Sequence, residues 1–392
     1  MVSYVGTWMQ RIAQDWLILV ITGSAGALGI TTGLQFLPTL LLSPMAGVVA
    51  DRYAKRRILA CTSLVQGAAA VALGTLAITG VIHAWHVYAL TLVFGAAGAF
   101  EVPARQAYIA EITTPGTFVN AMGLHSVIFN SARMVGPAIA GGLISLLGSG
   151  PRASGWVIVL NGASFGVVVV SLWLMRESEM MPSTRLTHSR HQLAEGLRYV
   201  RSRPDILLVL VVAFFIGTFG LNFGMTIALM ATRVYHRGAG QYGLLGSIFA
   251  IGSLTGAFGA ARRTLVRQRL IVVSGIVFGL VEVVAGLMPS YTTFALALAL
   301  CGATGMTVTT STNAYVQTAV GAEMRGRFMA VYMMSLMGGT TVGAPLLGWI
   351  ADRFGARWTL VGGGLVTAAG PVVAVAAFGR RQGVGVGGLT ER

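Results

Sequence analysis

Twelve stretches of mostly apolar residues, each about 20 residues or longer, run through this chain and decide what it can fold into. The hydrocarbon core of a bilayer is about 30 Å thick, so a helix needs roughly 20 apolar residues to cross it. Apolar residues make up 55% of the chain and charged residues 10%, whereas soluble domains carry roughly a quarter charged residues. The sequence therefore predicts an all-helical membrane protein with twelve transmembrane helices. The expected spans are 2–22, 28–50, 58–80, 84–104, 119–147, 155–176, 205–231, 241–261, 269–288, 291–315, 326–350 and 358–379.

Basic residues are distributed unevenly between the loops that join these spans. With a cytoplasmic N-terminus, 20 of the 27 Lys and Arg residues fall on the cytoplasmic side and five on the opposite side. Short cytoplasmic loops of membrane proteins carry such an excess. We therefore expect a multi-pass protein of the cell (inner or plasma) membrane with both termini in the cytoplasm. The net charge of +15 then reflects orientation in the membrane, and we expect no nucleic-acid partner.

The longest polar interruption separates the first six spans from the last six. Within it Leu193, Leu197 and Val200 recur at helical spacing, as in a short helix that lies on the membrane surface. That helix is either a solvated linker or a regulatory element, and the sequence leaves both open. Two halves of six helices are a plan that transporters use. The predicted parts are an N-terminal bundle at 1–176, a cytoplasmic linker at 177–204, a C-terminal bundle at 205–379 and a cytoplasmic tail at 380–392.

A Gly-x-x-x-Asp-Arg turn occurs twice, from Gly47 to Arg52 and from Gly348 to Arg353. The first copy runs into a basic cluster that contains Lys55 and Arg56 and joins the second span to the third. The second copy ends the eleventh span. Because charged residues are so rare in this chain, the repeat is not expected from composition alone. It indicates a shared role in the architecture of the two halves.

The first turn resembles the signature loop of the major facilitator superfamily, with Ala54 where that pattern usually has Gly and Lys55 where it usually has Arg. Segments 6–17, 103–108, 130–137 and 325–332 are similar to the exporter branch that includes enterobactin and macrolide efflux proteins. The resemblance covers nearly the whole chain and implies two six-helix bundles that expose a central site alternately to either side. Members of the branch usually carry a cytoplasmic lead and more of the first helix than this chain does. Either its start is misassigned or helix 1 is truncated at its start.

The resemblance implies that the first turn helps to close the cytoplasmic side. Asp51 would lie near the positive N-terminal end of the eleventh helix, which attracts a carboxylate. Glu101 and Arg105, spaced i,i+4 where Pro103 is expected to loosen the end of helix 4, either join this gate or form a plain helix-end ion pair. A role as a positive-inside anchor without gating also stays open. The predicted gate residues are Gly47, Asp51, Arg52, Lys55, Arg56, Glu101 and Arg105.

Nine helices separate the ends of the second and eleventh helices, so we expect the second turn on the outer face. Inverted repeats of three helices within each half put such positions in related places. We therefore predict that Gly348, Asp352 and Arg353 form an outer latch that corresponds to the inner one.

Helix 1 carries polar residues inside its span, with Gln10, Arg11, Gln14 and Asp15 forming two i,i+4 pairs. Ionisable groups inside a membrane are costly and usually face a cavity, so Asp15 is our first candidate for reversible protonation. A buried structural ion pair between Arg11 and Asp15 is the alternative.

Four further polar residues lie inside later spans and are candidates for proton coupling or substrate contact. Arg133 either pairs with Asp15 or binds an anionic substrate, and Glu282 is a second possible proton site. Asn222 and Asn313 can line the cavity. The hydroxyl-rich run around Asn313 is instead expected to bond to its own helix.

A run of small residues in the fifth span contains Gly136, Pro137 and Gly141. Small residues let another helix approach closely, and Pro137 removes a backbone hydrogen bond so that the helix can bend. The run resembles the glycine-proline signature of proton-coupled drug exporters, with Ala140 where Gly is usual. It favours efflux, although generic helix packing explains it almost as well.

The chain shows no catalytic constellation, no metal-ligand spacing and no phosphate-binding loop, so we expect no enzyme activity, no metal and no cofactor. Transport must then use an ion gradient. We predict a secondary transporter, an antiporter that exports a drug, a macrolide-like compound or a siderophore by proton-coupled alternating access. Its expected partners are the small-molecule substrate, protons and the lipid bilayer, and we expect a monomer. Proton-coupled uptake, or a receptor or scaffold of the same fold that transports nothing, are the alternatives.

Overall fold

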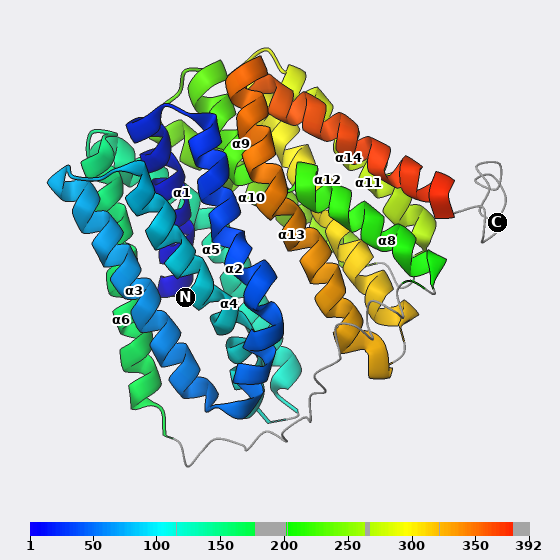
Figure 1. Ribbon diagram of the computed structural model, residues 1–392, viewed down its shortest axis with the longest axis horizontal. Helices are drawn as coiled ribbons and strands as arrows, with labels where there is room; N and C mark the ends of the chain where they lie inside the picture. The colour runs from blue at the N-terminus through cyan, green and yellow to red at the C-terminus, as the bar shows by residue number, and fades with distance from the viewer. Residues whose placement is uncertain (115, 177–200, 202, 263–266, 321, 379–392) are drawn as a thin grey trace. The chain divides into compact units, whose positions relative to one another are not determined.

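The structure is a computed structural model that describes the chain except for residues 115, 177–200, 202, 263–266, 321 and 379–392. The described residues are almost entirely helical (Figure 1). The predicted surface helix of the linker and the predicted tail at 380–392 lie outside the described residues.

Long helices follow the predicted spans closely, because a bilayer sets both their length and their composition. Ten helices of the described chain are long and apolar enough to cross a membrane. The two other long helices are α1 and α13, and both contain charged residues. Turn chemistry fixes several ends: Ser24 caps the start of α2 by accepting a hydrogen bond from the Ala27 N–H, and Gly23 ends α1 at a positive φ of 64°.

Residue contacts divide the chain into two compact units. Unit 1 comprises Met1–His188 together with His236–Ser247, and unit 2 comprises Ser189–Tyr235 together with Ile248–Arg392. The first part of α10 therefore groups with the helices of the first half. The helices of unit 1 are α1 (Val2–Thr22), α2 (Ala25–Arg52), α3 (Lys55–Thr79), α4 (Ala84–Glu111), α5 (Phe118–Leu146) and α6 (Pro151–Leu174), with the start of α10 (Ala239–Ala261).

In unit 1 the closest packing joins α3 to α6, and α1 packs between α5 and α6. Glycines make the α3–α6 contact possible, since a Cβ added at Gly74 would lie 2.7 Å from the Gly155 carbonyl oxygen. Backbones that approach this closely are typical of helices that associate in a membrane.

Unit 2 repeats this pattern, with α11 packed along α14 as α3 is packed along α6 (Figure 1). The seventh long helix of the chain belongs to unit 2 and is interrupted. Two π-helical turns, η2 and η3, divide it, and two residues without regular helix follow η2. π-Helical turns are rare and occur frequently at functional sites. The elements of unit 2 are α8 (Pro204–Phe215), η2 (Ile216–Gly220), α9 (Phe223–Leu229), η3 (Met230–Val234), the rest of α10, α11 (Gln268–Leu287), α12 (Tyr291–Ala319), α13 (Ala322–Phe354) and α14 (Arg357–Phe378).

One predicted boundary is wrong. Helix 4 was expected to end near Pro103, but α4 continues through this proline to Glu111. A proline costs a membrane helix one backbone hydrogen bond, and neighbouring groups can compensate for the loss. The two additional turns place Glu111 beside the turn between α2 and α3.

Candidate functional site

A polar face of α1 is buried inside unit 1. Gln10, Gln14 and Asp15 are each at most 6% exposed. Asn161 of α6 donates a hydrogen bond of 2.6 Å from Nδ2 to the Gln10 Oε1, and the Ser164 hydroxyl donates to the Asn161 Oδ1 at 3.0 Å. The hydrogen bond from Asn161 therefore holds the Gln10 amide against α6. Asp15 is the acidic residue of this polar face.

Asp15 accepts a hydrogen bond of 3.0 Å at Oδ2 from the hydroxyl of Tyr242, a fully buried residue at the start of α10. In the part of the chain that the structure describes, no ion pair within 4 Å joins Asp15 to Arg11. The carboxylate and the Arg11 guanidinium still attract each other at longer range, and the Arg11–Asp15 and Arg133–Asp15 pairs stay predictions. Sequence reasoning missed Tyr242, because the partners lie 227 residues apart.

The small residues of α5 bring the start of α10 to this position. Gly141 faces α10 so closely that an added Cβ would lie 3.0 Å from the Gly243 Cα. The Ser247 hydroxyl donates a hydrogen bond of 2.6 Å to the backbone oxygen of Met134. One residue before Pro137, Gly136 faces α1, where an added Cβ would lie 2.7 Å from the Trp8 Cβ. The Gly-Pro run therefore packs α5 against both α1 and α10, and α5 continues unbroken through Pro137.

Two arginines converge on one indole beside this face. The Arg11 guanidinium carbon lies 4.9 Å from the centre of the Trp8 ring, and that of Arg133, from α5, lies 5.7 Å from it. Arg11 also lies 5.4 Å from the ring centre of Phe36 on α2. These distances are within the range of cation–π attraction.

At the end of unit 1 where α3 begins, ion pairs join neighbouring helices. The Lys55 Nζ lies 2.8 Å from the Glu111 Oε1, and both side chains are less than 15% exposed. Arg56 donates a hydrogen bond of 3.1 Å to the backbone oxygen of Trp173 at the end of α6. Glu101 and Arg105 form the predicted i,i+4 ion pair. Sequence reasoning missed Glu111 because the end of helix 4 was placed too early.

The remaining predicted residues of this turn lie in the last two turns of α2. Asp51 is partly buried, and its neighbour Arg52 is exposed. An added Cβ at Gly47 would meet no atom within 4 Å, so close packing inside unit 1 does not require this glycine.

The second Gly-x-x-x-Asp-Arg turn ends α13 in unit 2. Its Asp352 forms an ion pair of 2.9 Å with Arg233 at the end of the seventh helix. The neighbouring Arg353 is exposed. The cation that pairs with this aspartate is therefore Arg233, which sequence reasoning did not select.

A second set of contacts lies at the same end of unit 2. The Arg357 Nη1 donates hydrogen bonds of 2.8 and 2.9 Å to the backbone oxygens of Gly286 and Met288. The Tyr235 hydroxyl donates to the same Met288 oxygen at 2.9 Å. Burial raises the pKa of Tyr235, which keeps this hydroxyl a neutral donor. These bonds tie the ends of the seventh helix, α11 and α14 together.

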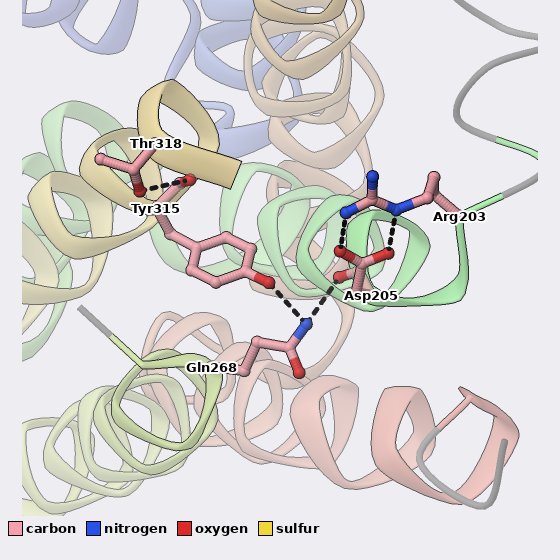
Figure 2. A network of polar contacts seen from close by, with 5 residues as sticks. All are labelled: Arg203, Asp205, Gln268, Tyr315 and Thr318. Atoms are coloured by element: carbon pink, nitrogen blue, oxygen red, sulfur yellow. Dashed lines mark hydrogen bonds and ion pairs between the residues drawn. The ribbon is translucent and has the colours of Figure 1, made fainter. Parts of the chain in front are cut away.

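The opposite end of unit 2 holds a separate network (Figure 2). Arg203 donates two hydrogen bonds to the Asp205 carboxylate, from Nε to Oδ1 at 2.9 Å and from Nη2 to Oδ2 at 2.6 Å. Gln268 at the start of α11 donates to the Asp205 backbone oxygen at 3.2 Å and to the Tyr315 hydroxyl of α12 at 2.8 Å. The network joins α8, α11 and α12, and none of its residues was predicted.

Three predicted polar residues belong to unit 2. Glu282 is 2% exposed on α11, where it faces Gly364 of α14. Asn222 follows η2 and donates from Nδ2 to the Thr218 backbone oxygen at 2.8 Å, while its buried Oδ1 has no hydrogen-bond partner among the described residues. Asn313 lies on α12 and accepts a hydrogen bond of 3.2 Å from Gln317. The neighbouring threonines of α12 bond to carbonyl oxygens of their own helix, as predicted.

Comparison with known proteins assigns the chain to a family. The family described as "Transmembrane secretion effector" matches residues 1–380. The chain belongs to this family. The match confirms the predicted membership of the major facilitator superfamily, whose members are transporters and not enzymes. The predicted fold class is also confirmed.

The chain is similar over most of its length to curated transporters. It is 24% identical to the staphyloferrin A transporter of Staphylococcus aureus, over 90% of this chain and 87% of the relative. It is 26% identical to the multidrug efflux pump Tap of Mycolicibacterium fortuitum, over 91% and 88%. Macrolide efflux protein A of Streptococcus pyogenes is 22% identical, over 93% and 91%.

Solved structures agree on the fold. An inward-facing bacterial homolog of the human lysosomal transporter Spinster gives a TM-score of 0.74 at 16% identity, covering 96% of both chains. The nucleoside transporter NupG gives 0.72 at 13% identity, covering 97% of this chain and 96% of that one. The family match and the curated relatives make the chain a multi-pass membrane transporter of the major facilitator superfamily.

Proposed function

We propose that this transporter exports an amphipathic small molecule, such as a drug, a macrolide-like compound or a siderophore, by proton-coupled alternating access. The observation that carries the proposal is the hydrogen bond between Asp15 and Tyr242. A carboxyl group that is 6% exposed inside a membrane helix is costly when ionised, and such groups mark proton relays. The efflux pumps among the relatives support export as the direction.

The contact suggests how a proton changes the protein. An ionised Asp15 accepts a charge-assisted hydrogen bond from Tyr242, which is stronger than a bond between neutral groups. Protonation removes that charge and weakens the attachment of the start of α10 to α1. The helix α10 continues from unit 1 into unit 2. Protonation of Asp15 therefore changes how firmly a helix that contributes to both units is held.

Ion pairs at helix ends are proposed as the gates. The cytoplasmic gate comprises the turn after α2, the Lys55–Glu111 pair and the Glu101–Arg105 pair. The outer latch comprises Asp352 with Arg233. The excess of basic residues in one set of loops supports cytoplasmic termini. A monomer is sufficient for this mechanism.

Proton-coupled uptake is a second candidate, and one observation favours it. Arg11 and Arg133 lie beside Trp8, and Arg11 precedes Asp15 by one helical turn of α1. An anion held by these guanidinium groups would be repelled by an ionised Asp15, so it would bind best together with a proton. Joint binding of proton and substrate is the linkage that uptake by symport requires.

Transport by inside-out membrane vesicles distinguishes the two directions. The compounds are a macrolide, ethidium as a general drug probe, and staphyloferrin A. Export predicts that an acidic vesicle interior drives accumulation of at least one compound, that a protonophore abolishes it, and that Asp15→Asn loses it while Asp15→Glu retains part. Proton-driven accumulation in right-side-out vesicles, or Asp15→Asn vesicles as active as wild type, would refute the proposal.

A further inference from the structure

A buried carboxyl group of unit 2 has no cation beside it. Glu282 of α11 is 2% exposed, and within the described residues no Lys, Arg or His lies within 4 Å of its carboxylate. Its Oε2 is buried and has no hydrogen-bond partner among these residues. An ionised carboxylate buried without a partner is costly, so such a group is either protonated or matched by a bound cation. The groups around Glu282 bear on which of the two applies.

The helices α11 and α14 approach each other closely at this carboxyl group. An added Cβ at Gly364 of α14 would lie 2.9 Å from the Glu282 Cβ and 2.6 Å from the Gly279 backbone oxygen. Three residues later, the fully buried Thr367 lies near enough to interact with the Glu282 carboxyl group, yet its Oγ1 has no hydrogen-bond partner in the described chain. Unsatisfied buried oxygens are rare, and a bound water or ion is one explanation for them.

The break in the seventh helix reaches the same place in unit 2. An added Cβ at Gly220, the last residue of η2, would lie 3.3 Å from the Thr367 Cγ2 and 2.5 Å from the Phe278 Cε1. Phe278 precedes Glu282 by one turn of α11. Asn222 follows in the break, and its Oδ1 is another buried oxygen without a partner among the described residues. Unwound segments of transporter helices coordinate small cations through their backbone oxygens.

The chemistry of these groups favours a small, hard cation with a single charge. Carboxylate, hydroxyl and amide oxygens suit hard cations, whereas many transition metals bind imidazole and thiolate. One carboxylate balances one positive charge, so a divalent ion would leave an uncompensated charge in the interior. Cys301 of α12 lies near Glu282, but no group of three His, Cys, Asp or Glu residues that could hold a metal ion occurs in the described part of the chain.

We propose that unit 2 binds a sodium ion between the Glu282 carboxylate and the Thr367 hydroxyl, with oxygen atoms from the break in the seventh helix completing its coordination. The ion links η2, α11 and α14 and thereby stabilises unit 2. This role goes beyond the proposed transport function, in which Asp15 carries the coupling proton. Sodium binding at this position does not require that the protein transports anything.

Sodium binding is measured on the purified full-length protein in a non-ionic detergent. Equilibrium binding of radioactive Na⁺ should be saturable and should be displaced by unlabelled sodium. Thermal unfolding is followed in increasing NaCl, with choline chloride keeping the ionic strength constant. The melting temperature should rise by about 2–5 °C when the sodium concentration is about a hundredfold above the dissociation constant.

Substitution locates the site. Glu282→Gln keeps the shape of the side chain but removes the charge, so it should lose both saturable sodium binding and the sodium-dependent rise in melting temperature. Thr367→Val should weaken binding about tenfold, whereas Thr367→Ser, which keeps the hydroxyl, should weaken it less. The control Thr359→Val removes another buried hydroxyl of α14, which donates to the Ala356 backbone oxygen, and should leave sodium binding unchanged. If Glu282→Gln does not fold, the two Thr367 variants keep the test valid.

Three results would overturn the inference: no saturable sodium binding by the folded wild type, undiminished binding in Glu282→Gln, or an equal loss in Thr359→Val and Thr367→Val. The first result is expected if Glu282 is protonated and a water molecule satisfies the buried oxygens. Because these measurements use no proton gradient, they are independent of transport. Sodium binding by a protein that transports nothing in vesicles would refute the proposed function alone, and proton-driven export without sodium binding would refute the inference alone.

Discussion

The hydrogen bond from Tyr242 to Asp15 yields the sharpest prediction, since Tyr242→Phe removes one oxygen atom and keeps the ring. Tyr242 is fully buried and Asp15 is 6% exposed, so water cannot readily replace the lost donor. A hydrogen bond to a charged group contributes about 1.5–3 kcal/mol. At about 1.4 kcal/mol for each factor of ten, Tyr242→Phe should slow proton-driven transport by about tenfold to about a hundredfold.

A double-mutant cycle separates this bond from general effects of each substitution. Initial rates of transport in vesicles, corrected for the amount of protein, are compared for wild type, Tyr242→Phe, Asp15→Glu and the double variant. Residues in direct contact show coupling energies of about 0.5–3 kcal/mol, so the two effects should not add. Tyr88→Phe is the matched control, because its partly exposed hydroxyl makes no hydrogen bond within the described chain.

Two results would refute this reasoning. Strictly additive losses in the cycle would show that the hydroxyl and the carboxylate act independently. A loss in Tyr88→Phe as large as that in Tyr242→Phe would show that the assay reports a general sensitivity to tyrosine substitution.

Three further predictions concern packing and charge at other sites. Gly141→Leu should destabilise the protein by about 1–3 kcal/mol and block transport, because its side chain would meet the α10 backbone; a normal melting temperature and rate would contradict this. Asp352→Arg should slow transport severalfold, in line with about 1 kcal/mol for a partly exposed pair, and Arg233→Asp in the same chain should restore the rate; no rescue would exclude a latch that depends on this pair. Glu282→Gln should keep proton-driven transport at half the wild-type rate or more, since Asp15 is assigned the coupling proton; complete uncoupling in vesicles would move that role to Glu282.

The bilayer explains why the fold could be predicted from the sequence. Span length and apolar content are local properties, and the start of α1 at Val2 and that of α12 at Tyr291 match their predicted positions. The end of α4 could not be predicted in the same way. Pro103 is a general signal for a helix end, but the membrane environment lets α4 continue to Glu111.

The site was only partly predictable, because its partners are distant in sequence. Asp15 is conspicuous as a carboxylate in an apolar span, whereas Tyr242 is an ordinary interfacial residue until the fold brings α10 to α1. The signal that could have found it is the small-residue run from Gly136 to Gly141, which requires a close helix partner. Nothing local in the sequence indicates that Arg233, rather than Arg353, pairs with Asp352.

The central claim is that export of substrate is exchanged for protons at Asp15. It is tested most directly in proteoliposomes that contain a pH-sensitive dye and the purified transporter, to which a transported compound is added outside without any preset pH gradient. The account predicts that the substrate enters as protons leave, so the interior becomes alkaline, and that Asp15→Asn abolishes the pH change. Acidification of the interior as substrate enters, or an unchanged signal in Asp15→Asn, would contradict it.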